Sequence, residues 1–222
     1  AEAWISSDML ALEEAFQEDL AQIKELGPKE EEYKAWLQQF PTLSLAVKDG
    51  KDPLVGLDLY NSFGSSVETN HENWKEMRLP GFIEFSDLGA FDGIVWLRKE
   101  IEVPASWDGK DLIMELGAID DRDLTYFNGS LVGAHEEGGF HQTRRSYTID
   151  GNLVKAGINT IAIRLTDNQG GGGITIRPDQ MVLRLTESEE SLPLAGNWKY
   201  KAVGEIRGNT LYTFDPETDE FD

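Results

Sequence analysis

The spacing of hydrophobic residues changes near position 42, from one typical of helices to one typical of short strands. Earlier in the chain, apolar residues recur every three or four positions, as on one face of a helix: Met9, Leu12, Phe16, Leu20 and Ile23. Gly27 and Pro28 predict the end of that helix. A second, shorter helix is predicted from four residues that share a face and precede Pro41: Tyr33, Trp36, Leu37 and Phe40.

Beyond position 42, the pattern predicts short strands separated by loops that contain Gly, Pro, Asp and Asn. The predicted strands cover residues 94–103, 112–116, 125–127, 130–132, 146–149, 160–165, 181–185 and 198–203. Asn128 and Gly129 lie between two of them and predict a tight type I′ hairpin, because both residues tolerate positive φ. Since no long helix separates these strands, we expect a sandwich or barrel and not βαβ units.

These patterns divide the chain into a helical segment (residues 1–41), a β domain (42–203) and an acidic tail or linker (204–222). The length of 222 residues and the hydrophobic fraction of 40% allow one large β domain with an ordinary core. The net charge of −21 disfavours binding to nucleic acid. No apolar run is long enough to predict a membrane span. The absence of cysteine excludes disulfides and thiolate metal sites.

The sequence provides no convincing hydrolytic centre. Ester hydrolysis needs an activated nucleophile and a base. Ser65 and Ser66 follow Gly64, but the flanking pattern of a nucleophile elbow is missing. The histidines are isolated, and none has an Asp three residues before it: His71, His135 and His141. We therefore expect that this chain has no catalytic residue of its own.

Three stretches of the β domain carry a family resemblance. They are residues 91–99 (FDGIVWLRK), residues 116–133 (LGAIDDRDLTYFNGSLVG) and residues 145–173, which end in Gly170, Gly171, Gly172 and Gly173. In this order they resemble the bacterial sialate O-acetylesterase family. They are similar, more distantly, to the sugar-binding jelly roll of glycoside hydrolase family 2 enzymes. The resemblance covers roughly residues 73–184.

The resemblance implies a mainly β, galactose-binding-domain-like jelly-roll sandwich, here with an N-terminal helical annex. In that family the module is inserted into an SGNH hydrolase domain, which supplies a Ser in a Gly-Gln-Ser-Asn setting and a His shortly after an Asp. Neither motif occurs in this sequence. We therefore expect a non-catalytic module whose parent enzyme hydrolyses acetyl esters on sialic acid or related glycans. The glycan and the hydrolase domain are the expected partners, both chain ends are expected to be stubs of the hydrolase domain, and a bacterial extracytoplasmic location is expected.

Asp120, Asp121 and Asp123 form a cluster of carboxylates at the entry to a strand. This position favours a structural role, in which the side chains bind turn amides. A bound cation is the alternative, although the spacing of Asp121 and Asp123 lacks the later Gly and Glu of an EF-hand loop. A structural calcium ion stays open, because jelly rolls often bind one through loop oxygens. No other cofactor is expected, and no metal ligand is assigned.

A sugar site needs an aromatic surface with polar groups beside it. Trp96 lies in an apolar strand and is expected in the core, whereas Trp107 lies in a loop and fits a sandwich cap or a sugar platform equally well. Arg98 and Arg145 are candidates for binding a sialate carboxylate with two hydrogen bonds, or for pairing with one of the many acids of the chain. The candidate carbohydrate-binding residues are therefore Trp107, Arg98, Arg145 and Asp121.

The four glycines lack the Lys-Ser/Thr that follows a phosphate-binding loop. They are expected to let a loop approach another surface closely. The family resemblance implies that this surface is the active site of the parent esterase. Two other functions remain open, namely a stand-alone carbohydrate-binding module and a structural interaction domain.

Overall fold

The computed structural model describes residues 30–137 and 141–218, and the chain divides into the units Ala1–Phe40 and Pro41–Asp222. In the first unit, helix α3 (Glu30–Leu37) confirms the second predicted helix. Trp36 stacks on Tyr33 with ring centroids 5.3 Å apart and meets Phe40 edge-on at 4.7 Å. The helix predicted from Met9 to Ile23 lies outside the described residues.

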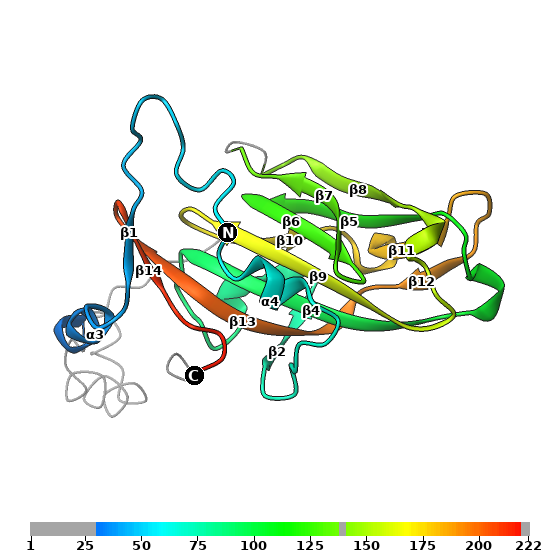
Figure 1. Cartoon of the computed structure of the whole chain (residues 1–222), viewed down its shortest axis with the longest axis horizontal. Coiled ribbons are helices and arrows are strands. Elements are labelled where there is room, and N and C mark those ends of the chain that lie inside the picture. The colour runs from blue at the N-terminus through cyan, green and yellow to red at the C-terminus, as the bar shows by residue number, and fades with distance from the viewer. Residues whose placement is uncertain (1–29, 138–140, 219–222) are drawn as a thin grey trace, which may run out of the picture. The chain divides into compact units, whose positions relative to one another are not determined.

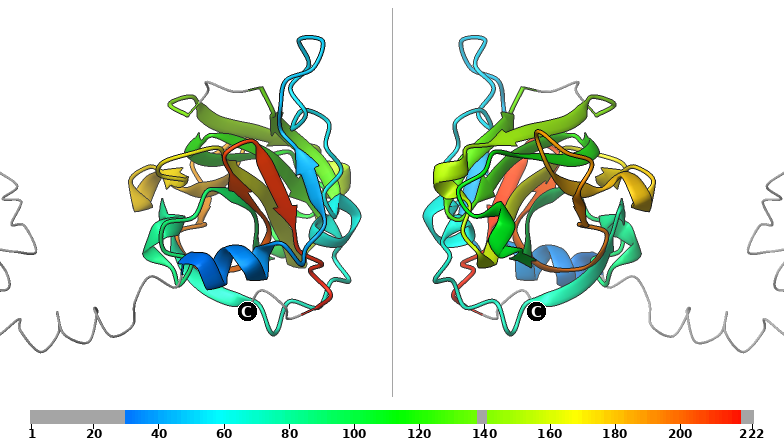
Figure 2. Two further views of the ribbon diagram at one scale, coloured as in Figure 1. Left: turned by 90° about the vertical axis from the view of Figure 1, so that its left-hand side faces the viewer. Right: turned by 90° about the vertical axis from the view of Figure 1, so that its right-hand side faces the viewer.

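The second unit is built from two antiparallel sheets (Figures 1 and 2). Within the described residues, the larger sheet has eight strands: β1 (Thr42–Ser44), β2 (Lys75–Leu79), β4 (Gly93–Val103), β6 (Arg122–Phe127), β7 (Ser130–His135), β9 (Gly157–Asp167), β13 (Gly196–Arg207) and β14 (Thr210–Thr213). Their order is β1-β14-β13-β4-β9-β6-β7, and β2 also pairs with β13. The smaller sheet has six strands: β3 (Gly81–Phe82), β5 (Leu112–Asp120), β8 (Arg144–Ile149), β10 (Gly173–Thr175), β11 (Val182–Leu185) and β12 (Ser191–Pro193). Their order is β12-β11-β5-β10-β3, with β8 on the other edge of β5.

This arrangement confirms the predicted fold class, a mainly β jelly-roll sandwich. Each predicted strand is present, and Asn128 (φ 48°) and Gly129 (φ 81°) form the predicted turn between β6 and β7. The sheet extends beyond the predicted boundary at residue 203. Strand β13 continues to Arg207, β14 follows, and Leu211 and Phe214 are buried, so this part of the predicted tail belongs to the sandwich.

The larger sheet is buried on both faces, which explains the continuous apolar run at the start of β4. Val95 and Leu97 point into the core between the two sheets. Ile94 and Trp96 point the other way, into a second hydrophobic cluster. Residues 52–74, which we call the covering segment, supply the other side of that cluster and include the short helix α4 (Asn61–Ser65). A strand covered on both faces loses the alternation of a half-exposed strand.

Buried arginines of the sheet fasten the covering segment. Arg122 Nη2 donates to Asp52 Oδ2 at 2.7 Å. Arg164 Nη1 donates to the carbonyl oxygen of Leu57 at 2.5 Å and to the side-chain oxygen of Asn61 at 2.7 Å. Hydrogen bonds from a charged donor are stronger than neutral ones, so these contacts fix the segment in place without a strand ladder. Among the described helices, none is long and apolar enough to cross a membrane.

Candidate functional site

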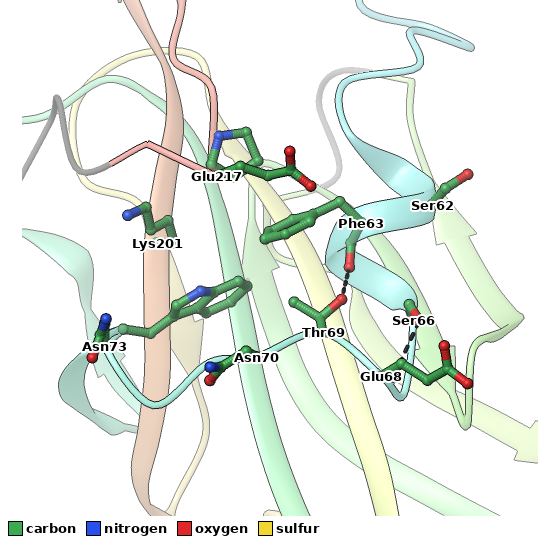
Figure 3. Close-up of a pocket in the computed structure, with 11 residues that line it drawn as sticks. Ser62, Phe63, Ser66, Glu68, Thr69, Asn70, Asn73, Lys201 and Glu217 are labelled. Atoms are coloured by element: carbon green, nitrogen blue, oxygen red, sulfur yellow. Dashed lines mark hydrogen bonds between the residues drawn. The ribbon is translucent and has the colours of Figure 1, made fainter.

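A pocket of about 720 Å³ opens where the covering segment meets β13. This volume lies within the roughly 300–1,000 Å³ of small-molecule sites. The lining comes from α4, the loop that follows it, one strand of the larger sheet and a turn near the end of the described chain: Ser62, Phe63, Ser66, Glu68, Thr69, Asn70, Asn73, Trp74, Lys201, Pro216 and Glu217 (Figure 3). Because these segments are distant in the sequence, the folded sandwich is needed to bring them together.

Helix α4 reaches the pocket because Gly64 lets it lie directly on the sheet. A Cβ atom at Gly64 would come within 2.1 Å of the Trp96 ring, so a larger residue does not fit there. The carbonyl oxygen of Gly64 also accepts a hydrogen bond from Arg98 Nη1 at 2.7 Å. This seating carries Phe63 to the pocket wall, where its ring stacks near that of Trp74 with centroids 6.2 Å apart.

The loop after α4 is held by hydrogen bonds at both of its ends. The Thr69 hydroxyl donates to the carbonyl oxygen of Phe63, and the Thr69 amide donates to the carbonyl oxygen of Ser66 at 3.3 Å. At the other end, Lys199 Nζ of β13 donates to the carbonyl oxygen of Trp74 at 3.2 Å. The loop is therefore tied to both the helix and the sheet, which keeps the pocket open in a defined form.

The pocket combines aromatic surface with hydrogen-bonding groups of both kinds. Figure 3 shows Phe63 directed from α4 into the cavity, with Glu217 on one side and Asn70 on the other. The exposed side-chain amides of Asn70 and Asn73 bring donors and acceptors, and Asn70 Oδ1 already accepts from the Glu72 amide at 2.9 Å. Lys201 also lines the cavity but is only 5% exposed. A pyranose has an apolar C–H face and a rim of hydroxyl groups that both donate and accept. The lining therefore has the chemistry that a saccharide unit requires.

Three of the predicted sugar-binding side chains are buried in this structure. Trp107, Arg98 and Arg145 are only 2%, 1% and 0% exposed, respectively. The Trp107 indole packs in the core between the sheets and donates to Glu190 Oε2 at 3.1 Å, which corresponds to the cap role and not to a platform. Arg98 lies 5.9 Å from the centre of the Trp74 ring. In this conformation none of the three presents a surface to a dissolved sugar.

Arg145 belongs to a buried polar network that joins the two sheets, which we call the Asp123 network. Its Nε donates to Asp123 Oδ1 at 2.7 Å, while Tyr147 and Thr125 each donate a hydroxyl to Asp123 Oδ2 at 2.7 Å. Burial and the neighbouring Asp123 carboxylate raise the pKa of Tyr147. Since Asp123 and Thr125 lie on β6, and Arg145 and Tyr147 on β8, the network pins one sheet to the other.

Asp121 lies half-buried at the turn from β5 into β6. Its Oδ2 accepts hydrogen bonds from the backbone amide and from the side-chain amide of Asn168, both at 2.9 Å. This is the amide-binding role expected for a carboxylate at a strand entry. The structure thus links Asp121 to the start of the glycine-rich loop.

Two of the four glycines, Gly172 and Gly173, make close approaches within the chain itself. A Cβ atom at Gly172 would lie 2.6 Å from the Asp167 Cβ, and one at Gly173 would lie 2.4 Å from the carbonyl oxygen of Gly81. Carboxylates hold the loop backbone, because Gly170 N donates to Asp92 Oδ1 at 2.9 Å and Gly172 N donates to Glu84 Oε1 at 3.0 Å. Close packing is present at Gly172 and Gly173, and the approached surface seen here is the rim of the sandwich.

Sequence reasoning missed the pocket residues Phe63, Asn70, Asn73 and Lys201. Of the lining residues, Ser66 was weighed only as a nucleophile. The apolar run of residues 94–97 was a usable signal for the pocket. A strand buried on both faces needs a further layer of chain over the larger sheet. Residues 52–74 belong to no predicted strand, so they can form this layer. Their aromatic and Asn residues then become candidates for a site on its surface.

No family model and no curated protein matches the chain. Among solved structures, it is similar to a glycosyl hydrolase family 2 member from Bacteroides cellulosilyticus, at 22% identity and a TM-score of 0.44, over 55% of this chain and 18% of that one. It is also similar to a Bacteroides uniformis β-glucuronidase, at 18% identity and a TM-score of 0.43, over 73% of this chain and 18% of that one. The chain thus spans less than a fifth of these two enzymes. The fold class rests on the two sheets described above.

Proposed function

We propose that this chain is a non-catalytic, carbohydrate-associated β-sandwich module whose pocket binds a saccharide unit. The observation that carries this proposal is the half-buried Phe63 ring, backed by the buried Trp74 ring, beside the exposed amides of Asn70 and Asn73 in one cavity. Aromatic rings bury the apolar face of a sugar, and fixed polar groups beside them select the positions of its hydroxyls.

Calorimetric titration of the chain with a panel of sialylated, O-acetylated and neutral oligosaccharides tests the pocket. We expect at least one to bind with a Kd of about 1 mM or tighter, which corresponds to about −4 kcal/mol. Phe63→Ala should weaken that binding about 2- to 10-fold, because an aromatic contact contributes about 0.5–1.5 kcal/mol.

Phe85→Ala is the control for this experiment, since Phe85 is 85% exposed and is not part of the pocket lining. Its affinity should equal that of the unaltered chain. Circular dichroism establishes that both variants are folded. Absence of binding to the whole panel, or equal losses in both variants, would contradict a saccharide site in this pocket.

In the finer form of the proposal, the parent is a sialate O-acetylesterase-like enzyme that acts outside the bacterial cytoplasm. Its SGNH hydrolase domain and its acetylated glycan are the partners, and the loop of Gly170 to Gly173 faces the parent's active site. The support is the ordered set of motifs in residues 91–99, 116–133 and 145–173. Sequencing the gene on both sides of this segment is the test. We expect Gly-Gln-Ser-Asn before it and Asp-x-x-His or Asp-x-His after it, whereas unrelated flanking domains would exclude this parent.

A further inference from the structure

Five carboxylates gather at one end of the sandwich, where β5 and β9 end and the glycine-rich loop begins. Asp120 is the last residue of β5 and lies opposite Gly173, while Asp167 is the last residue of β9 and lies opposite Gly93. Asp92 and Glu84 are close enough to repel the charge of Asp167, and Asp121 repels both Asp120 and Asp167. Like charges at this density need compensation in a partly buried place.

The backbone of the loop donates a hydrogen bond to one oxygen of Asp167 and to one oxygen of Glu84. The second oxygen of each carboxylate has no hydrogen-bond partner among the described residues. Asp167 Oδ1 accepts a hydrogen bond from the Gln169 amide at 3.0 Å, and Glu84 Oε1 accepts one from Gly172. Asp167 Oδ2 and Glu84 Oε2 are buried and have no hydrogen-bond partner among the described residues. Asp167 is 0% exposed. Because a buried unpaired acceptor is costly, these oxygens indicate that a positive charge belongs nearby.

A set of possible ligand atoms lies within electrostatic range of Asp167 and Glu84. Single ligand atoms of Asp120, Asp121 and His141 all lie within 4.8 Å of one another. Ligand atoms about 2.0–2.5 Å from a shared ion can be separated by at most about 4–5 Å, so this spacing suits a common ion. Arg145 Nη2 fixes the backbone on both sides of Asp120, since it donates to the carbonyl oxygens of Ile119 at 3.0 Å and Asp121 at 2.9 Å.

We propose that Asp120, Asp121 and His141 bind a divalent cation, and that its charge compensates the unpaired oxygens of Asp167 and Glu84. A mixed set of carboxylates and one imidazole suits Zn²⁺ or Mn²⁺ better than Ca²⁺, which prefers oxygen ligands alone. The Asn168 contacts engage Asp121 Oδ2, and the carboxyl groups of Asp120 and Asp121 lie within hydrogen-bond range of each other. This site is separate from the saccharide pocket, whose lining contains none of these residues.

Calorimetric titration of the EDTA-stripped chain with ZnCl₂, MnCl₂ and CaCl₂, in the absence of any sugar, tests the site. We expect one saturable site per chain, which binds Zn²⁺ or Mn²⁺ more tightly than Ca²⁺. Asp120→Asn and His141→Ala should each weaken Zn²⁺ and Mn²⁺ binding by more than about 10-fold. Asp179→Asn is the control, because Asp179 is an exposed acid that pairs with Arg177 at 3.4 Å, and the affinity of this variant should be unchanged.

Absence of saturable binding for all three ions would overturn the proposal. So would equal affinities in the Asp120, His141 and Asp179 variants, since that result describes general attraction to the acidic surface. Circular dichroism identifies a variant that fails to fold. His141 is exposed, so His141→Ala keeps the test decisive if Asp120→Asn misfolds. Because no sugar is present, failure here leaves the pocket proposal standing, and the converse also holds.

Discussion

Two buried aspartates, Asp123 and Asp167, lie near one another in the fold but in opposite electrostatic surroundings. Asp123 is 1% exposed and has a guanidinium and two hydroxyls directed at its oxygens. Asp167 is equally buried, but its neighbours are the carboxylates of Asp92, Glu84 and Asp121, and one of its oxygens has no hydrogen-bond partner among the described residues. The chain supplies donors to both oxygens of Asp123, whereas one oxygen of Asp167 lacks a donor among the described residues.

The difference shows how a structural carboxylate can be told from one prepared for a ligand. A buried carboxylate with a full set of donors stabilises the fold and leaves nothing for a ligand to satisfy. A buried carboxylate among other carboxylates is stable only when a proton or a cation joins it. Sequence position does not separate the two cases, since the fully paired Asp123 lies only two residues from Asp121, a proposed ligand of the cation.

The largest expected effect is on Asp123. Asp123→Asn leaves the Arg145 guanidinium buried without its counter-charge, so the free energy of unfolding should fall by about 3–5 kcal/mol. Asp167→Asn is the comparison and should be neutral or stabilising in EDTA, because it removes a repelled charge. Urea denaturation of both variants measures the two values. Similar losses in both would show that Asp167 is as well satisfied as Asp123.

A second test uses neighbouring glycines of the loop. Gly172→Ala places a Cβ atom 2.6 Å from the Asp167 Cβ, so the loop must shift, at about 1–3 kcal/mol of stability. Gly171→Ala meets nothing closer than the Phe82 ring at 3.7 Å and should change stability by less than about 1 kcal/mol. Thermal unfolding compares the two variants. Equal stabilities would mean that the loop does not pack on Asp167.

The pH dependence of stability should reveal the raised pKa values of Asp167 and Asp120. Burial and the nearby Asp92 carboxylate raise the pKa of Asp167 to about 7, and burial raises that of Asp120 to about 6. The folded state then binds more protons than the unfolded state between about pH 4 and 7. Stability in EDTA should therefore fall as the pH rises through that window, by at most about 1.4 kcal/mol per pH unit for each group, and level off above it.

Urea denaturation at several pH values measures this slope, with Asp167→Asn as the reference. That variant should lose the slope between about pH 6 and 7 and about half of the slope between about pH 4 and 6, where Asp120 also contributes. An unchanged slope in Asp167→Asn would show that Asp167 is ionised throughout the window.

The smallest expected effect is at Tyr147. Tyr147→Phe removes one of the hydroxyl donors to Asp123, and the hydroxyl also lies 3.0 Å from His135 Nδ1. We expect a loss of about 0.5–1.5 kcal/mol in the free energy of unfolding, because Arg145 and Thr125 still satisfy Asp123. Chemical denaturation measures this loss. A loss as large as that of Asp123→Asn would indicate that the network depends on the tyrosine more than on the ion pair.

The sequence predicted the long strands well because their patterns are local. Residues 94–103 and 160–165 are rich in branched and aromatic residues, and positive φ at Asn128 and Gly129 explains the turn between β6 and β7. The short strands β3, β10 and β12 escaped prediction, since two or three residues carry no periodicity. Strand β14 was assigned to an acidic tail, although Leu211 pairs with β13 and is buried. Pairing with a distant strand, and not composition, decides whether such a segment forms a strand.

The candidate site was less predictable than the fold. Trp107, Arg98 and Arg145 have the residue types of a sugar site, but their burial depends on which face of which sheet they occupy. Asp121 was correctly placed at a strand entry, whereas its proximity to His141 depends on how β5 and the start of β8 are arranged. Contacts between segments that are distant in the sequence cannot be predicted from the spacing of residues along one chain.

The covering segment gives the pocket a thermodynamic link to the stability of this region. Phe63 and Trp74 belong to the segment, whereas Lys201 belongs to the sheet beneath it, so the pocket exists only while the segment is closed. Any occupant then adds its binding free energy to the closed state and slows local opening. A substitution that loosens the segment, even one distant from the pocket, would weaken affinity without removing a single contact to the ligand.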